Sequence, residues 1–175
     1  MKHNSCSRAW DDEGRPVRHK SIAQGQYCIS DDPDAVITTV LGSCVAACIR
    51  DPHRGIGGMN HFVLPKSPTP PPQHCDPYRY GDHLMPSLID ALIAKGAKLA
   101  RLEAVVFGGA STFESFYNVG ERNRDFALDF LFAEGITIID APRVCALGCR
   151  LEYWPFSGKA VQTPLGATRG ARHRA

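Results

Sequence analysis

The sequence lacks the long apolar run that a membrane-spanning helix requires, because no stretch approaches roughly 18 consecutive apolar residues. Residues 1–20 are polar and contain no apolar core, so we expect neither a secretory signal peptide nor a mitochondrial presequence. The formal net charge is only +2, which is too small a field to indicate a nucleic-acid partner. These absences predict a soluble, cytoplasmic protein without membrane insertion.

A disulfide framework is also missing from the pattern. The chain has seven cysteines, and an odd number without a secretion signal predicts reduced thiols. Two Cys-x-x-x-Cys pairs, Cys44 with Cys48 and Cys145 with Cys149, leave a metal-binding protein open as an alternative. Residues four apart on a strand lie roughly 13 Å from each other, however, which disfavours a shared ion. We therefore expect no metal and no organic cofactor.

What is present is the composition of an ordinary globular domain. The chain has 175 residues, of which 43% are hydrophobic and 22% charged, and this length suffices to bury a core. We expect a disordered N-terminal extension over residues 1–21, one domain over residues 22–162, and a solvated basic tail over residues 163–175.

The secondary-structure pattern mixes strands with two helices. Apolar positions at helical spacing predict helices at residues 82–95 and 118–134, and a proline-rich loop is expected at residues 65–77. Strands are predicted at residues 23–30, 36–41, 45–49, 59–64, 102–107 and 136–140, with a hairpin formed by residues 150–156 and 159–162. The first two strands are expected to pair or to be neighbours. The pattern indicates an α/β or α+β domain, and composition does not choose between their topologies.

A thiol and an imidazole mark the stretch where chemistry is expected. Cys44 follows Gly42 and Ser43 in a turn at a strand edge, where a glycine lets backbone N–H groups lie exposed next to the sulfur. Seventeen positions later, His61 shares one face of a predicted strand with Met59. Two neighbouring strands would bring the ring to the sulfur.

Such a pair has a clear chemical use. A cysteine thiol has a pKa of about 8.5, and an adjacent imidazole that accepts its proton leaves a thiolate able to attack acyl carbons. The imidazole can then pass the proton to a leaving group. Three other interpretations stay open: Cys44 can pack as a small hydrophobe, His61 can be a hydrogen-bonded core residue, and Thr38 can be a packing residue of a strand.

The two motifs resemble a known family. The segments TTVLGSCVAACIRDP and GIGGMNHFVLP, together with FGGASTFES at residues 107–115 and NVGERN at residues 118–123, are similar to the bacterial chemoreceptor glutamine deamidases (CheD). The resemblance covers about residues 22–162. It implies a layered α/β sandwich of mixed sheet with two or three helices, similar to the catalytic domain of the cytotoxic necrotizing factor toxins.

The resemblance also implies roles for single residues. It makes Cys44 the nucleophile, His61 its base, and Thr38, six positions before the cysteine, an assisting residue. Gly148 and Arg150 match a glycine and arginine pair of the family.

Four further positions are candidates for binding substrate or an oxyanion. Backbone N–H groups around Gly42 and Ser43 would stabilise the oxyanion, and the turn that contains Gly109 and Ser111 lies near the active site of such proteins. A turn that only reverses the chain is the alternative for these last two residues.

The implied activity converts glutamine side chains of methyl-accepting chemoreceptors to glutamate, with release of ammonia through a thioester. The implied partners are those receptors and, as a further candidate, a CheC-type phosphatase. A non-catalytic adaptor that binds either partner is the alternative function, and a methylesterase is a close chemical variant that the sequence does not separate from an amidase.

Overall fold

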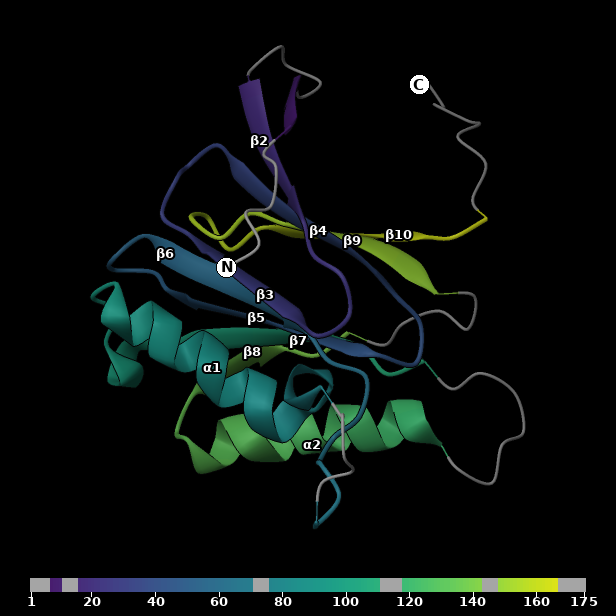
Figure 1. Ribbon diagram of the computed structural model, residues 1–175. Helices are drawn as coiled ribbons and strands as arrows, with labels where there is room; N and C mark the ends of the chain where they lie inside the picture. Colours follow the sequence, from purple (N-terminus) through teal and green to yellow (C-terminus); the bar gives the residue numbers. More distant parts are fainter. Residues whose placement is uncertain (1–6, 11–15, 71–75, 111–117, 143–147, 167–175) are drawn as a thin grey trace.

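The structure is a computed structural model that describes residues 7–10, 16–70, 76–110, 118–142 and 148–166. Over these residues, two five-stranded sheets lie face to face, and helices α1 (Gly81–Ala94) and α2 (Val119–Ala133) cover the outer face of one of them (Figure 1). This order of sheet, sheet and helices confirms the predicted α/β sandwich. No helix of the described residues is long and apolar enough to cross a membrane.

Both sheets are mixed. Sheet A contains, in spatial order, β1 (Ser7–Trp10), β2 (Pro16–Ser21), β4 (Ala35–Leu41), β9 (Cys149–Tyr153) and β10 (Ala160–Pro164). Sheet B contains β3 (Gln26–Ser30), β6 (Ile56–His61), β5 (Val45–Asp51), β7 (Glu103–Gly108) and β8 (Thr137–Asp140). The pairs β2 with β4 and β7 with β8 are parallel, and the other neighbours are antiparallel.

The helices form where the apolar spacing predicts them. Asn118 caps α2, because its side chain accepts a hydrogen bond from the Glu121 N–H at 3.2 Å. Gly96 follows α1 with a φ of 94°, a left-handed conformation that glycine adopts without a steric penalty. Pro86 lies inside α1, and the helix continues through it.

Two expectations are wrong. Residues 1–21 are not all disordered, since β1 and β2 form a hairpin there and β2 runs parallel to β4. Arg18 and Asp32 add an ion pair at 3.0 Å to this contact. The strands predicted at residues 23–30 and 36–41 are not neighbours either, because β3 belongs to sheet B and β4 to sheet A. Both errors have one cause. Which strands pair depends on segments that are distant in the sequence, and the residues of one segment do not reveal its partner.

Strand β5 is buried on both faces and divides the interior into two cores. Its even-numbered residues face sheet A and its odd-numbered residues face the helices, as strand geometry requires. The core between the sheets is built by Ile22, Ile37, Leu41, Cys44, Ala46, Cys48, Met59, Phe107, Cys149, Leu151 and Tyr153. A second core joins sheet B to α1 and α2. The sulfur of Cys44 therefore belongs to the layer between the two sheets.

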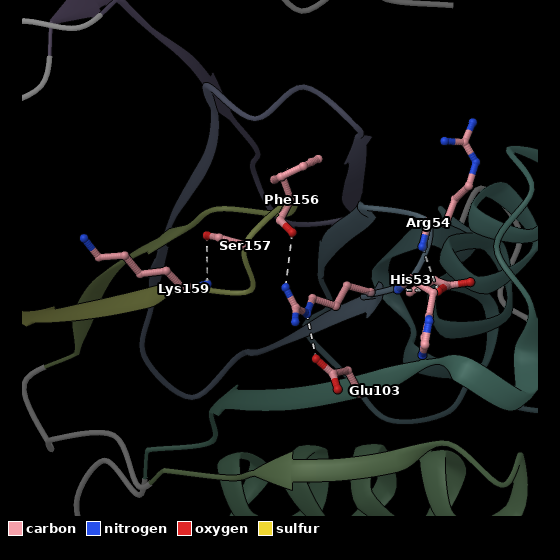
Figure 2. A network of polar contacts seen from close by, with 8 residues as sticks. His53, Arg54, Glu103, Phe156, Ser157 and Lys159 are labelled. Atoms are coloured by element: carbon pink, nitrogen blue, oxygen red, sulfur yellow. Dashed lines mark hydrogen bonds and ion pairs between the residues drawn. The ribbon is translucent and has the colours of Figure 1, made fainter.

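A polar network fixes the far end of β5. Arg50 donates to Glu103 on β7 at 2.6 Å and to the Phe156 carbonyl, in the β9–β10 connection, at 3.2 Å (Figure 2). At the adjacent turn, the buried Asp51 carboxylate accepts hydrogen bonds from the backbone N–H groups of His53 and Arg54 at 3.0 and 3.1 Å. This turn joins β5 to β6 and so helps to hold the register of the two strands that carry the candidate pair.

Candidate active site

The register of β5 and β6 places Cys44 and His61 on one face. Val45 and Phe62 form an antiparallel bridge with two backbone hydrogen bonds, of 3.2 and 3.0 Å. In this register His61 opposes Ala46, whereas Cys44 lies one step beyond Val45 on the same face. The two residues are diagonal neighbours, whose Cα atoms lie about 7–8 Å apart in such sheets, within reach of an imidazole ring. The strands thus place the two residues as diagonal neighbours on one face, and the meeting of their side chains stays a prediction.

The imidazole is held by Thr39 rather than by Thr38. Thr39 Oγ1 lies 2.8 Å from His61 Nδ1 and 2.9 Å from the Ile22 carbonyl oxygen, and both side chains are buried. Alternation along β4 explains the choice, because Thr39 points toward the layer between the sheets and Thr38 toward the other face. The ring contact therefore belongs to Thr39, and the assisting role that the resemblance implies for Thr38 stays a prediction.

The Thr39 contacts also determine the tautomer of His61. The hydroxyl has a single hydrogen, and the Ile22 carbonyl can only accept, so the hydroxyl donates there and accepts from Nδ1–H. Protonated Nδ1 leaves Nε2 with a free lone pair in the neutral ring. Nε2 is buried and has no hydrogen-bond partner among the described residues. The ring therefore presents an unsatisfied base to the layer that contains the sulfur.

Burial keeps both members of the pair neutral. His61 is 2% exposed, and burial lowers its pKa to about 4. Burial likewise raises the pKa of the Cys44 thiol, which is 7% exposed. At neutral pH the resting pair is thus thiol and imidazole, not thiolate and imidazolium, and the proton must move during the attack.

Three groups oppose the effect of burial on the thiol. The backbone N–H of Cys44, the side-chain amide of Gln24 and the charge of Arg79 each favour the thiolate and lower the pKa of Cys44 against the larger effect of desolvation. Gln24 Nε2 lies 3.5 Å from the sulfur. The backbone N–H next to the sulfur is that of Cys44 itself, and the oxyanion role of Gly42 and Ser43 stays a prediction.

The glycine turn after β7, at residues 108–110, holds the turn at residues 42–44 that contains Cys44. Gly109 donates its N–H to the Cys44 carbonyl at 2.9 Å, and Ala110 donates to the Gly42 carbonyl at 3.0 Å. A Cβ on Gly108, whose φ is 104°, would stand 2.1 Å from the Cys44 carbonyl oxygen. The N–H of Gly109 is therefore engaged within the protein and does not serve an oxyanion. Ser111, the other candidate in this turn, lies outside the described residues.

Sequence reasoning missed Asn123. This fully buried α2 residue donates from Nδ2 to the Ser43 carbonyl at 3.1 Å and to the Val63 carbonyl at 2.8 Å. With the two bonds from the glycine turn, each carbonyl of residues 42–44 accepts a hydrogen bond. The signal in the sequence for this residue was its place in the NVGERN motif.

A cavity of about 430 Å³ opens beside the imidazole. Its lining includes His61, Gln24, Thr38 and Arg150, so Thr38 borders this space even though it does not hold the ring. Cys48, four residues from the nucleophile candidate, instead lines a separate cavity of about 90 Å³.

The alternative metal centre has no support in the part of the chain that the structure describes, where no cluster of three or more histidine, cysteine, aspartate or glutamate residues could hold an ion. Cys44 and Cys48 are free thiols there, and Cys145 lies outside the described residues.

Comparison with known proteins gives consistent relatives. Proteins named "Probable chemoreceptor glutamine deamidase CheD" are 54% identical in Rhizobium etli (strain CIAT 652), over 85% of this chain and 81% of the relative, and 50% identical in Rhizobium meliloti (strain 1021), over 89% and 85%. The protein of that name from Caulobacter vibrioides is 46% identical over 87% of this chain and 80% of its own.

Solved structures add only a distant likeness. The Bacillus licheniformis hypothetical protein YfiH has 16% sequence identity and a TM-score of 0.45, over 74% of this chain and 60% of that chain, and no function follows from it. A family model described as CheD chemotactic sensory transduction matches residues 63–163. Given this match and relatives of about half identical sequence over most of its length, the chain belongs to the CheD family.

Proposed function

We propose that this protein is a protein-glutamine deamidase that converts glutamine side chains of chemoreceptors to glutamate and releases ammonia. The relatives' printed name supports the substrate class. The observation that carries the chemistry is His61, whose Nδ1–H is bound by Thr39 and whose buried Nε2 lacks a partner beside the strand that carries Cys44. A base held by a third group, on the strand next to a thiol, supplies the two groups that nucleophilic attack by sulfur uses.

The reaction begins with proton transfer from the Cys44 thiol to His61 Nε2 as the sulfur attacks the carboxamide carbon. The resulting tetrahedral oxyanion collapses, the C–N bond breaks, and Nε2–H protonates the departing nitrogen so that ammonia leaves. Nε2 then takes a proton from water, whose oxygen attacks the thioester. The C–S bond breaks, the sulfur recovers its proton, and glutamate remains. No step needs a metal ion or an organic cofactor.

We assign the positioning role to Thr39. It binds Nδ1–H through both transfers, which keeps the lone pair on Nε2 in the resting enzyme and stabilises the imidazolium that forms. Thr38 and Arg150, which line the adjacent cavity, are placed to contact the substrate side chain or its neighbours. The backbone N–H of Cys44 is the oxyanion donor nearest to the sulfur.

The cytoplasmic parts of chemoreceptors are the partners that this activity requires, which places the proposed reaction in the cytoplasm. A CheC-type phosphatase remains a candidate partner whose binding is testable by mixing the purified proteins.

The test uses an intact receptor and four forms of the protein: wild type, Cys44→Ala, His61→Gln and Cys48→Ala. Mass spectrometry of receptor peptides measures conversion of Gln to Glu, and ammonia release is measured in parallel. Wild type and Cys48→Ala should convert the receptor, while Cys44→Ala and His61→Gln should not, although all four remain folded by circular dichroism.

Conversion that persists in Cys44→Ala would remove the nucleophile. Binding of receptor by wild type without any change of its mass would favour the adaptor instead, and methanol released from methylated receptor would indicate an esterase.

A further inference from the structure

A polar side chain reaches the sulfur of Cys44 from outside the strands that carry Cys44 and His61. Gln24 lies in the turn before β3, and its Nε2 donates toward Cys44 Sγ at 3.5 Å. The sequence pattern predicted only an extended segment here and gave this residue no role. Its side chain also lines the cavity beside His61, where a substrate carboxamide would enter.

The turn that carries Gln24 is attached to the catalytic residues on both sides. Before it, the Ile22 carbonyl accepts the hydrogen bond from Thr39, and the Ile22 N–H donates to the Thr38 carbonyl at 2.9 Å. After it, the Gly25 N–H donates to the His61 carbonyl at 2.8 Å. The position of the Gln24 backbone is therefore fixed relative to both the base and the strand that orients it.

The proposed reaction needs donors at this place. When the sulfur adds to a carboxamide, the oxygen on the attacked carbon, two bonds from the sulfur, acquires a full negative charge, and preorganised donors stabilise it. The glycine turn does not supply them, since the N–H groups of Gly109 and Ala110 are bound to backbone carbonyls. The Cys44 N–H faces the sulfur, and Gln24 Nε2 approaches from another element.

We propose that Gln24 is a catalytic residue whose side-chain amide is the second donor of the oxyanion hole, together with the backbone N–H of Cys44. This assignment rests on the proposed thiol chemistry of Cys44. The amide has two hydrogens, so it can pass from the resting sulfur to the oxyanion as charge moves from one to the other. The group needs to move little, because both acceptors belong to the same tetrahedral centre.

Two other roles of Gln24 would change different kinetic parameters. A residue that only stabilises the thiolate would affect every reaction of the sulfur, including its alkylation. A residue that only binds the substrate would raise KM and leave kcat unchanged. An oxyanion donor lowers kcat for acyl transfer and leaves alkylation nearly unaffected, because alkylation of a thiolate creates no oxyanion.

The experiment compares wild type with Gln24→Leu, which keeps the bulk without a donor, and Gln24→Glu, which replaces the donor by an acceptor of the same shape. Gln162→Leu, in β10 and away from this cavity, is the matched control. Three rates are measured for each full-length protein: ammonia release from receptor, the acylation burst with p-nitrophenyl acetate, and alkylation by iodoacetamide, with the labelled cysteine identified by peptide mass spectrometry.

Gln24→Leu should lower kcat for ammonia release and the acylation burst by about 100-fold, while alkylation of Cys44 should fall far less, because it loses only the contribution of Gln24 to the thiolate. Gln24→Glu should be at least as impaired, and Gln162→Leu should match wild type. An unchanged acylation burst in Gln24→Leu would overturn the proposal, as would equal losses in acylation and alkylation. Because the burst needs no receptor, a wild type that acylates but leaves receptor unchanged would refute the proposed substrate and not the role of Gln24.

Discussion

Replacing Thr39 by valine tests which threonine serves the base. Valine keeps the branched shape but removes the hydroxyl that joins His61 Nδ1–H to the Ile22 carbonyl. Each buried polar group left without its partner costs about 1–3 kcal/mol. If the same 1–3 kcal/mol is lost from the bias toward the Nδ1–H tautomer, turnover should fall by roughly 5- to 150-fold.

The assay is ammonia release per folded molecule, with the folded fraction taken from urea denaturation. Thr39→Ser keeps the hydroxyl and should recover most of the rate. Thr38→Val is the matched neighbour, which borders the cavity but has no contact with the ring, and should affect KM more than kcat. Nitrogen NMR of histidine-labelled protein, with His61→Gln to identify the signal, reports the tautomer directly.

The expected spectrum has Nδ1 protonated in wild type and Thr39→Ser, and loses this preference in Thr39→Val. A Thr39→Val protein that turns over within twofold of wild type, or a Thr38→Val protein with the larger loss in kcat, would refute the assignment of the positioning role to Thr39.

Three further predictions follow from the same geometry. Burial lowers the pKa of His61 to about 4, against roughly 6.5 in the unfolded chain, so between these pH values only the unfolded state binds this proton. The free energy of unfolding should therefore fall by about 3 kcal/mol from this source as the pH drops from ~7 to ~4. Urea denaturation of His61→Gln should lack that part of the fall. Asn123→Leu should lower the free energy of unfolding by about 1–3 kcal/mol and abolish most of the turnover, since two buried carbonyls lose their donor. Asn118→Ala should lower the free energy of unfolding by about 1 kcal/mol, because a helix cap is lost, and should leave turnover unchanged. Gly108→Ala should lower the melting temperature far more than Gly135→Ala, because a Cβ at Gly108 meets the Cys44 carbonyl and one at Gly135 meets nothing within 4 Å.

Local sequence predicted much of the secondary structure because its signals are themselves local. The helices α1 and α2 follow from apolar spacing and from Asn118 and Gly96 at their ends. Strands β4 and β5 follow from β-branched and apolar runs. Strand β2 could not be predicted in this way, since its polar residues become a strand only by pairing with β4.

The site divides in the same manner. Residue type indicated a thiol and an imidazole as the reactive groups. The alternation of side chains along a strand indicated that both could lie on the same face of two nearby strands. The identity of their supports could not. Asn123 lies in a polar helix turn, a pattern typical of solvent-exposed residues, and it is buried because α2 packs over the turn at residues 42–44.

The sequence by itself determined that Cys44 stands after a glycine turn, that His61 stands in an extended segment, and that strands are mixed with two helices, whereas the layered sandwich was implied only by the family resemblance. Only the tertiary structure decided that Thr39 faces the imidazole, that the N–H groups of the glycine turn donate to carbonyls of the Cys44 turn, and that Gln24 reaches the sulfur. The physical reason is that residue type and periodicity act within a few positions, whereas a hydrogen bond between residues twenty or more positions apart depends on the register and stacking of two sheets.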